Sequence, residues 1–339
     1  MRNIIKLAVL TVWGGALFSQ TGPEKKIDSL YRIEVNGVDH LVFIKRENIK
    51  NPILFVLHGG PGFSDFYLWQ TYNQELEDHF TVVAYDQRGT GLTFTENTPA
   101  ESMTYQQLTD DAHKLLSFLK KELEQDKAYL LGFSAGTIIG VYLAHRYPQE
   151  IEAFISVGQV VNGRKNEKLC LDYNLQKAKE QQNWAALEEL KPLLNFYPSG
   201  DPKTDLSALK TLRKWNRKNY GHFCEGTSMG QLFEGISDKA KEHIDQGFIS
   251  KGESFSMEHL WGEIIDLDLL STHTVFQVPV YFLVGKCDFN TPFSLTQEYF
   301  EKIKAPNKDI LYFENSGHYV PFVEPEKFND YLATEILNK

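Results

Sequence analysis

Short, continuous runs of apolar residues recur along the chain and alternate with segments whose apolar residues have helical spacing. The runs lie at residues 53–57, 81–85, 128–131, 153–157, 278–284 and 310–313. A run of this length is typical of a strand that is buried on both faces of a parallel sheet. Residues 105–123 instead place leucine and alanine three or four positions apart, which predicts a helix. Strands that alternate with helices predict an α/β fold with a mostly parallel, doubly wound sheet.

An antiparallel hairpin is expected ahead of these strands. Apolar and polar residues alternate between residues 31 and 46, and Asn36-Gly37 divides this segment in two. An Asn-Gly pair favours the two-residue turn of a hairpin, because both residues tolerate a positive φ. The sheet is therefore expected to begin with antiparallel strands.

The pattern changes between residues 163 and 273. Strand-like runs disappear there, and helical spacing predicts helices near residues 169–179, 184–194, 206–219 and 230–246. We therefore expect residues 163–273 to form a helical cap, inserted into a core made of residues 20–162 and 274–339. A helical insertion at this place can fold over a substrate pocket and shape its selectivity.

Residues 1–19 have the features of an export signal. Arg2 and Lys6 give a positive start, residues 7–18 are apolar, and the small Ser19 could precede a cleavage site. The apolar stretch is shorter than the roughly 20 residues that span a membrane, so no integral span is expected in the mature chain. A buried first strand is the alternative. We expect an exported protein, periplasmic or secreted, or a cytoplasmic one if the segment is not a signal.

A strand-like run, the pentapeptide Gly132-Phe133-Ser134-Ala135-Gly136 and a helix-like run follow one another directly. This order resembles the nucleophile elbow of the α/β-hydrolases, in which a strained, tight turn exposes the hydroxyl of a serine. The glycines leave room for the turn, and the N-terminus of the next helix favours negative charge beside the serine. A second match, at residues 226–230, follows no strand-like run and is expected in a loop between helices. Ser134 is therefore the predicted nucleophile, and Ser228 is not.

Two further residues complete a predicted catalytic triad. A serine nucleophile needs a histidine base, and the base needs an acid that orients it. The order along the chain in this fold is serine, acid, histidine. Of the ten histidines only His318 follows the last predicted strand, and Asp288 follows the strand before it. Asp266 and Asp268 are rivals for the acid, but both precede that strand.

A glycine-rich turn at residues 58–62 follows the strand at 53–57. Acyl transfer needs two backbone N–H groups that bind the developing oxyanion. Ala135, directly after the nucleophile, is expected to supply one, and Gly60 of this turn the other; a purely structural turn is the alternative. The loop at residues 86–91 follows the next strand and is expected to brace the site rather than to take part in the chemistry.

Charge and cysteine content limit the partners of the chain. The formal net charge is −10, whereas binding to nucleic acid or to an anionic membrane surface needs clustered positive charge. An acidic surface fits solubility alone, or cationic substrates such as peptides with a free amino terminus. Cys170, Cys224 and Cys287 have no metal-ligand spacing, and one disulfide is possible but not required. We predict no cofactor, no metal and no nucleic-acid partner.

Five motifs give the chain a resemblance to a known family. HGGPG at 58–62, DQRGTG at 86–91, GFSAG at 132–136, GKCD at 285–288 and SGH at 316–318 resemble the proline iminopeptidase branch of the α/β-hydrolases. The likeness covers residues 30–162 and 275–339, and the first two motifs are the more specific ones. It implies the α/β-hydrolase fold and the release of an N-terminal residue, often proline, whose amino group is held by carboxylates of the cap.

The chain departs from that branch around the nucleophile and in the cap. Ala135 stands where those peptidases carry a bulky aromatic residue, and the Trp-Glu step expected in the cap is absent, since Asn216 follows Trp215. The candidates for binding an amino group are Glu225, Glu234, Glu253 and Glu258, each of which is also explained as a solvated charge.

These observations predict a serine hydrolase that works through an acyl-enzyme and releases the N-terminal residue of a short peptide. A carboxylic-ester hydrolase with the same machinery, acting on a small molecule, is the first alternative. A binding module without catalysis is the second, although the intact Ser134, Asp288 and His318 argue against it. Dehalogenases and epoxide hydrolases of this fold use an aspartate at the elbow, so the serine argues against both classes.

Overall fold

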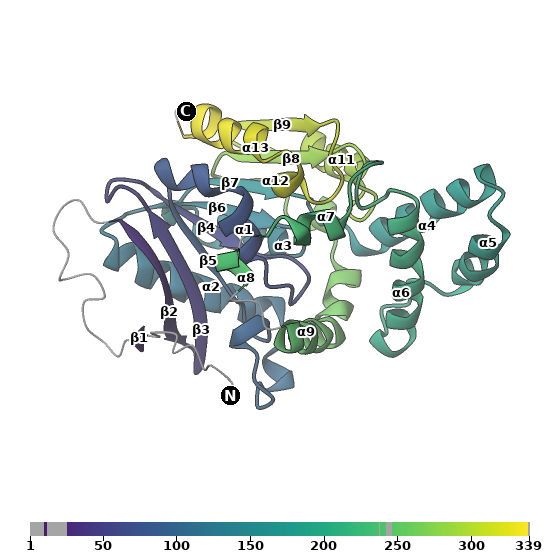
Figure 1. Ribbon diagram of the computed structural model, residues 1–339, viewed down its shortest axis with the longest axis horizontal. Coiled ribbons are helices and arrows are strands. Elements are labelled where there is room, and N and C mark those ends of the chain that lie inside the picture. Colours follow the sequence, from purple (N-terminus) through teal and green to yellow (C-terminus); the bar gives the residue numbers. More distant parts are fainter. Residues whose placement is uncertain (1–9, 12–25, 237, 242–245, 338–339) are drawn as a thin grey trace.

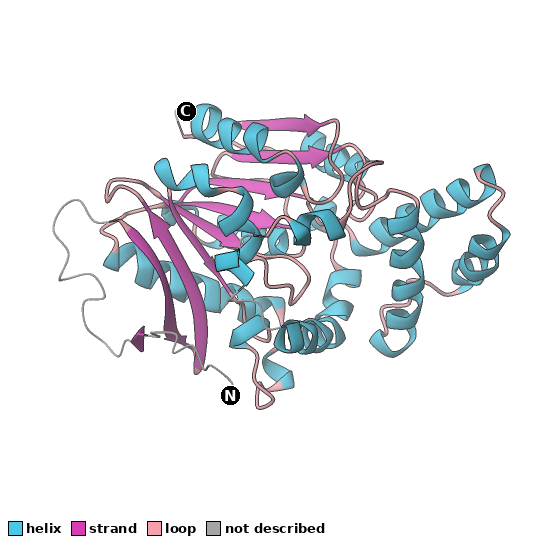
Figure 2. Cartoon of the chain, in the orientation of Figure 1, coloured by secondary structure: helices cyan, strands magenta, loops and turns pink. Residues whose placement is uncertain are grey.

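The computed structural model describes residues 10–11, 26–236, 238–241 and 246–337, and a nine-stranded sheet forms its centre (Figures 1 and 2). Its strands are β1 (Leu10–Thr11), β2 (Ile27–Val35), β3 (Val38–Arg46), β4 (Ile53–Leu57), β5 (Thr81–Tyr85), β6 (Ala128–Phe133), β7 (Ile151–Val157), β8 (Val280–Gly285) and β9 (Lys308–Phe313). Their order across the sheet is β1-β2-β3-β5-β4-β6-β7-β8-β9. β3 runs antiparallel to β2 and to β5, and the other neighbouring pairs are parallel. The predicted, mostly parallel sheet is confirmed.

The hairpin formed by β2 and β3 has the predicted turn. Val35 pairs with Val38, so Asn36 and Gly37 alone connect the two strands. Their φ angles are 52° and 75°. Two consecutive positive φ values match the turn that follows the natural twist of antiparallel strands, which explains the Asn-Gly pair.

The strands that were predicted from continuous apolar runs are all present. β4 and β5 have the predicted bounds, and β6 to β9 each extend or shift by about two residues. Every residue of β4, β5, β6 and β8 is buried. Continuous apolar runs are found because helices cover both faces of these strands, which leaves no solvent-facing position for a polar side chain.

Helices cover both faces of the sheet. α2 (Tyr105–Glu122), α3 (Gly136–Arg146) and α11 (Phe293–Lys302) pack on one face, and α1 (Phe66–Tyr72), α12 (Val320–Val323) and α13 (Pro325–Tyr331) on the other. Thr104 begins α2 by accepting a hydrogen bond from the N–H of Gln107, as an N-cap residue does. Short 3₁₀ helices at Gln74–Asp78, Gly91–Thr93, Ala100–Ser102, Pro148–Glu150 and Lys191–Asn195 and a π-helix at Leu332–Ile336 complete the set.

The described residues between β7 and β8 form helices and loops. These are α4 (Gly163–Glu180), α5 (Trp184–Leu190), α6 (Pro202–Lys218), α7 (Met229–Glu234), α8 (Asp238–Lys241), α9 (Gln246–Asp266) and α10 (Leu269–Thr272). Figure 1 shows α4, α5 and α6 beyond the end of the sheet toward which the arrows of β8 and β9 point. α4, α5, α6 and the end of α9 share a small core of their own, which includes Leu171, Leu187, Leu212, Trp261 and Ile265. We call residues 163–273 the helical insertion.

Two helix predictions for the insertion were wrong in extent. The single helix expected at residues 230–246 is replaced by α7 and α8, since the first of these ends at Glu234. A Cβ on Gly235 would lie 2.3 Å from the hydroxyl oxygen of Tyr72, so the backbone there approaches α1 closely. The helix expected at 184–194 ends at Leu190 and continues as a 3₁₀ helix, because Pro192 cannot donate a backbone hydrogen bond.

The predicted export signal lies outside the described residues except for Leu10–Thr11. These two residues form β1, which runs parallel to β2. Among the helices that the structure describes, none combines the length and the apolar character that a membrane crossing requires.

Candidate active site

Ser134 occupies a tight turn between β6 and α3. Its φ is +52°, in a region that L-residues other than glycine rarely adopt. Gly136 lies so close to β4 that a Cβ there would be 2.0 Å from the carbonyl oxygen of Leu57, and a Cβ on Gly132 would be 2.8 Å from Cα of Thr137. The two glycines of the pentapeptide are therefore required by backbone packing, and the turn holds the serine at the carboxyl end of the sheet.

The three predicted triad residues lie within hydrogen-bonding distance of one another. The Ser134 hydroxyl oxygen is 2.9 Å from Nε2 of His318, and Nδ1 of His318 is 2.8 Å from Oδ2 of Asp288. All three residues are buried. They follow β6, β9 and β8, so parallel strands that end at the same edge of the sheet bring together residues that are far apart in the chain.

The carboxylate of Asp288 has a full set of hydrogen-bond donors. Oδ1 accepts from the backbone N–H groups of Asn290 and Thr291, each at 2.8 Å. Oδ2 accepts from the Thr291 hydroxyl at 2.8 Å, in addition to His318. The Thr291 hydroxyl oxygen is also 3.2 Å from Nδ1 of His318. The orientation of the carboxylate is therefore fixed by the turn that follows it. Sequence reasoning missed Thr291, although a threonine three residues after an aspartate in a turn is a common partner.

The turn at residues 58–62 packs directly on the nucleophile. A Cβ on Gly59 would lie 2.8 Å from Cβ of Ser134. His58 fixes the turn from behind: its Nε2 accepts from the N–H of Gln87 at 3.0 Å, so the proton is on Nδ1, which donates to the carbonyl of Gly59 at 2.9 Å. Burial lowers the pKa of His58 to about 4, which keeps the ring neutral at ordinary pH. The predicted oxyanion donors, Gly60 and Ala135, both line a cavity beside Ser134.

The loop at residues 86–91 has contacts that fit the predicted bracing role. Nε and Nη2 of Arg88 donate to the two carboxylate oxygens of Asp111 on α2, at 2.7 and 3.1 Å. Oδ2 of Asp86 accepts from the N–H of Leu92, while its Oδ1 is buried without a protein partner in the described part of the chain. Burial raises the pKa of Asp86 to about 6. The carboxylate fits only because residue 91 is a glycine, where a Cβ would lie 2.3 Å from Oδ2 of Asp86.

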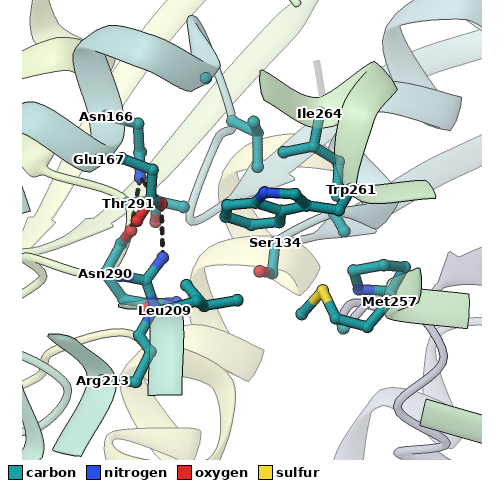
Figure 3. Close-up of a pocket in the computed structure, with 15 residues that line it drawn as sticks. Ser134, Asn166, Glu167, Leu209, Arg213, Met257, Trp261, Ile264, Asn290 and Thr291 are labelled. Carbon is teal, nitrogen blue, oxygen red and sulfur yellow. Dashed lines mark hydrogen bonds and ion pairs between the residues drawn. The ribbon is translucent and has the colours of Figure 1, made fainter. Parts of the chain in front are cut away.

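Two cavities meet at Ser134. The small cavity, of about 100 Å³, is lined by the predicted oxyanion donors and by the insertion residues Gly163, Asn166, Glu167, Leu209, Arg213, Met257, Trp261 and Ile264. Figure 3 shows the polar residues Asn166, Glu167, Asn290 and Arg213 on one side of it and Met257, Trp261 and Ile264 on the other. The large cavity, of about 440 Å³, lies on the side of His318 and includes Phe133, Arg217, His222, Phe223, Glu253 and Tyr319.

An ion pair forms the polar wall of the small cavity. Nη2 of Arg213 lies 2.5 Å from Oε1 of Glu167, and Oε2 of Glu167 accepts from the hydroxyl of Tyr197 at 2.6 Å. Burial by itself would lower the pKa of Arg213, but the adjacent carboxylate outweighs it and raises that pKa. The pair is therefore charged and locally neutral in sum. Sequence reasoning missed it because the two residues lie on different helices, 46 positions apart.

Unpartnered acceptors lie beside this pair. Nδ2 of Asn166 donates to the backbone carbonyl of Asn290 at 2.9 Å and to Glu167 at 3.1 Å. The side-chain oxygens of Asn166 and Asn290 are buried without a hydrogen-bond donor among the described residues. Buried acceptors are rarely left without a donor, so a ligand or water that carries N–H or O–H groups would complete this wall.

The four glutamates predicted as amine binders are not equivalent. Glu253, on α9, lines the large cavity. All four side chains are exposed, and Glu225, Glu234 and Glu258 line neither cavity. The solvated interpretation therefore fits those three, whereas Glu253 remains close to the predicted nucleophile.

A disulfide joins the helical insertion to the loop of Asp288. Cys224, between α6 and α7, is bonded to Cys287, and Cys170 is a free, buried cysteine. Two backbone hydrogen bonds of 2.8 Å lie beside the disulfide: the N–H of Phe289 donates to Gly221, and the N–H of His318 donates to His222. Residues 221–224 of the insertion therefore contact both loops that carry the predicted acid and base.

Comparisons with known proteins agree with this fold. A family model described as the alpha/beta hydrolase fold matches residues 52–187. The probable aminopeptidase YbaC of Bacillus subtilis (strain 168) is 27% identical over 314 residues, which cover 92% of this chain and 97% of that protein. The chain has the α/β-hydrolase fold. The predicted fold is thereby confirmed.

Further proteins resemble the chain over most of its length. The putative carbamate hydrolase RutD of Agrobacterium fabrum (strain C58) is 23% identical over 293 residues, or 86% of this chain and 95% of that protein. Among solved structures, proline iminopeptidase of Mycobacterium smegmatis superposes with a TM-score of 0.66 at 22% identity, covering 91% of this chain and 98% of that one. The predicted resemblance to the proline iminopeptidase branch is confirmed as a likeness of fold.

Proposed function

We propose that this α/β-hydrolase is a serine hydrolase in which Ser134, His318 and Asp288 act as nucleophile, base and acid. Nε2 of His318, 2.9 Å from the Ser134 hydroxyl, takes its proton as the oxygen attacks the substrate carbonyl. Asp288 holds the tautomer of His318 and stabilises the imidazolium that forms. The imidazolium then gives the proton to the leaving group, the acyl bond to Ser134 forms, and water releases the acid in the same way. The N–H groups of Gly60 and Ala135 stabilise the oxyanion.

The reaction we propose is the release of an N-terminal residue from a short peptide. The small cavity beside the oxyanion donors has room for one residue rather than for an extended chain. In such a substrate the α-ammonium group lies one carbon from the attacked carbonyl. The unpartnered side-chain oxygens of Asn166 and Asn290, together with the carboxylate of Glu167, supply acceptors for its N–H groups. This set of buried acceptors beside Ser134 is the observation that carries the proposal.

A direct test combines labelling with a substrate panel. A fluorophosphonate probe is expected to label the wild-type protein and not Ser134→Ala, and turnover of aminoacyl arylamides is expected to fall at least about 10³-fold in that variant. Ser228→Ala is the matched control, because Ser228 lies in the second Gly-x-Ser-x-Gly match and serves as the N-cap of α7. Labelling that survives in Ser134→Ala would assign the reaction to another residue.

A carboxylic-ester hydrolase is the second candidate, and one observation favours it. The charge of Glu167 is already neutralised by Arg213, and much of the remaining wall is apolar, with Leu209, Met257 and Trp261. A cavity of this kind also accepts a small uncharged acyl group. The same panel separates the two functions: turnover of short acyl esters without turnover of any aminoacyl arylamide would favour the esterase.

We also propose that the helical insertion acts as a cap and that the protein works outside the cytoplasm. Residues of α6 and α9 line both cavities, and residues of α4 line the small one, which supports a role in choosing a small-molecule or short-peptide substrate. The Cys224–Cys287 disulfide supports an oxidising compartment, where such bonds persist. Fractionation of cells of the source organism, with N-terminal sequencing of the mature protein, tests export. A cytoplasmic, uncleaved chain would contradict it.

A further inference from the structure

The positions of Ala135 and His318 determine which cavity receives each half of the substrate. Ala135 lines the small cavity and not the large one, whereas His318 lines the large cavity and not the small one. In acyl transfer the carbonyl oxygen lies at the backbone donors, and the histidine delivers its proton to the leaving group. The acyl group therefore extends into the small cavity, and the leaving group into the large one.

Two arginines on α6 reach the cavities, and only one of them is neutralised. Arg213 lines both cavities, and its charge is paired with that of Glu167. Arg217 follows four residues later, on the same face of the helix, and lines the large cavity. Among the residues that the structure describes, Arg217 has no ion pair and no side-chain hydrogen bond. Its guanidinium is thus the cation of the large cavity that remains available to a ligand.

Glu253 is a second charged residue of the large cavity, but it does not form an ion pair with Arg217. Glu253 of α9 lines the large cavity and, within the described part of the chain, forms no ion pair or hydrogen bond. The side chain of Glu253 is exposed, but the protein atoms around it exclude part of its hydration and raise its pKa, and the positive charge of Arg217 acts in the opposite direction. The two side chains influence each other through space without closing a salt bridge. An anionic ligand could therefore bind the guanidinium of Arg217 without displacing a partner, but the negative charge of Glu253 would repel it.

We propose that Arg217 binds a free carboxylate of the leaving group, so that the preferred substrates are short peptides with an unblocked carboxyl terminus. A guanidinium forms paired, charge-assisted hydrogen bonds with a carboxylate, and these are among the stronger polar contacts in proteins. The inference rests on the proposed hydrolysis at Ser134. It assigns a ligand group to the large cavity, which the acyl group does not occupy. The leaving product is an amino acid or a very short peptide, whose new amino group receives its proton from His318.

The size of the large cavity limits the length of such substrates. Each additional residue moves the carboxylate about 3.5 Å further from the cleaved bond. A cavity of about 440 Å³ that already includes both His318 and Arg217 holds one or two residues beyond that bond. Longer peptides would carry their carboxylate past Arg217 and would lose this contact. Dipeptides and tripeptides are therefore the expected substrate class.

The test compares substrates that differ only in the charge of the leaving group. One pair is an aminoacyl-glycine dipeptide and its glycinamide counterpart, with the aminoacyl group that performs best in the arylamide panel. A second pair, the acetyl esters of 3-hydroxybenzoate and 3-hydroxybenzamide, tests the same preference for a charged leaving group if the protein hydrolyses esters. For the wild-type protein we expect the free acid to exceed the amide in kcat/KM by about 5- to 50-fold, since one charge-assisted contact is gained.

Three variants on the cavity walls and beside them make the test specific. Arg217→Gln is expected to remove the preference for the acid, because it lowers kcat/KM for the acid far more than kcat/KM for the amide. Glu253→Gln is expected to increase the preference, because it removes the competing negative charge. Lys218→Gln is the matched control: Lys218 is the next residue of α6, lies over the ring of Trp215 at 4.6 Å, and lines neither cavity. It removes the same charge and should leave the preference intact.

Failure of this inference is distinguishable from failure of the proposed function. If the wild-type protein is not labelled by the fluorophosphonate probe and turns over none of the substrates, hydrolysis at Ser134 is contradicted, and the inference is contradicted with it. Normal turnover with equal rates for acid and amide would overturn the carboxylate site alone. If Lys218→Gln loses the preference for the acid to the same extent as Arg217→Gln, the preference arises from the overall positive charge of α6. That result would also overturn a specific role of Arg217.

Discussion

Cys224 of the helical insertion is covalently bonded to Cys287, whose neighbour in the chain is Asp288, the proposed catalytic acid. The disulfide lies where the insertion meets the loops that follow β8 and β9. The backbone N–H of Cys287 also donates to the carbonyl of Ser316, two residues before the proposed base His318. The geometry of the acid and base is therefore connected to the insertion as well as to the sheet.

Loss of the disulfide should reduce both stability and turnover. The bond closes a loop between residues 63 positions apart, for which chain entropy alone predicts a stabilisation of about 4 kcal/mol. We expect the double variant Cys224→Ser/Cys287→Ser to unfold at a lower urea concentration and to show a lower kcat. Both are measured with and without a reducing agent. The double variant should not respond to the reductant, and a wild-type protein that is equally insensitive would contradict the role of the bond.

The hydroxyl of Thr291 should act through the orientation of Asp288. Thr291→Val keeps the shape of the side chain but removes the donor to Oδ2 of the carboxylate. We expect kcat to fall roughly 10-fold with little change in KM, since a lost hydrogen bond to a charged group weakens the positioning of His318 by about that amount. Thr291→Ser retains the hydroxyl and should retain most of the activity. Equal losses in the two variants would indicate a packing effect instead.

Asp86 should make the protein less stable as the pH rises. Burial raises the pKa of Asp86 in the folded state to about 6, from an ordinary value of 3.8. The folded state therefore binds more protons than the unfolded state between these values, so the contribution of Asp86 to stability falls over that interval and is constant above it. The full shift corresponds to about 3 kcal/mol, most of it between about pH 4 and pH 6.

The variant Asp86→Asn isolates this effect, because all other titrating groups are shared with the wild type. Its free energy of unfolding, relative to the wild type, should rise by about 2 kcal/mol between about pH 4.5 and pH 7.5. Urea unfolding at the two pH values measures the difference. A difference that does not depend on pH would show that Asp86 titrates alike in the folded and unfolded states.

Gly317 should be intolerant of any side chain. A Cβ on this residue would lie 2.4 Å from the carbonyl oxygen of His222, which accepts the backbone hydrogen bond of His318. We expect Gly317→Ala to lose stability and most of its activity, as the loop of His318 is pushed away from the insertion. Gly230→Ala is the control, since its new Cβ would lie 3.7 Å from the Ser228 hydroxyl oxygen and meet nothing closer. It should keep full activity.

The strands and the proximity of the three proposed triad residues could be predicted, because each leaves a local signal. Residues 53–57 and 81–85 are strands whose apolar runs are continuous, as burial on both faces requires. Ser134, Asp288 and His318 each follow such a run. Because parallel strands end at the same edge of a sheet, the fold class predicts that the three residues meet there. Local pattern and tertiary arrangement point in the same direction in this part of the chain.

The polar part of the cavities could not be predicted, since its residues lie on separate helices of the insertion. Glu167 and Arg213 are each unremarkable charges on an amphipathic helix until α4 and α6 pack together. The disulfide was one of three possible pairings of three cysteines, and spacing alone did not choose among them. α9 was missed because glycine, serine and aromatic residues interrupt its helical pattern. Tertiary packing decided these features.

The hydrogen bond from the backbone of His318 to the carbonyl of His222 has a consequence for engineering. A chimera of this molecule that received a foreign insertion would lose an acceptor for the backbone of His318, and the cysteine opposite Cys287 as well. Redesigning the substrate range by domain grafting would therefore require transplanting residues 221–224 together with the loops after β8 and β9.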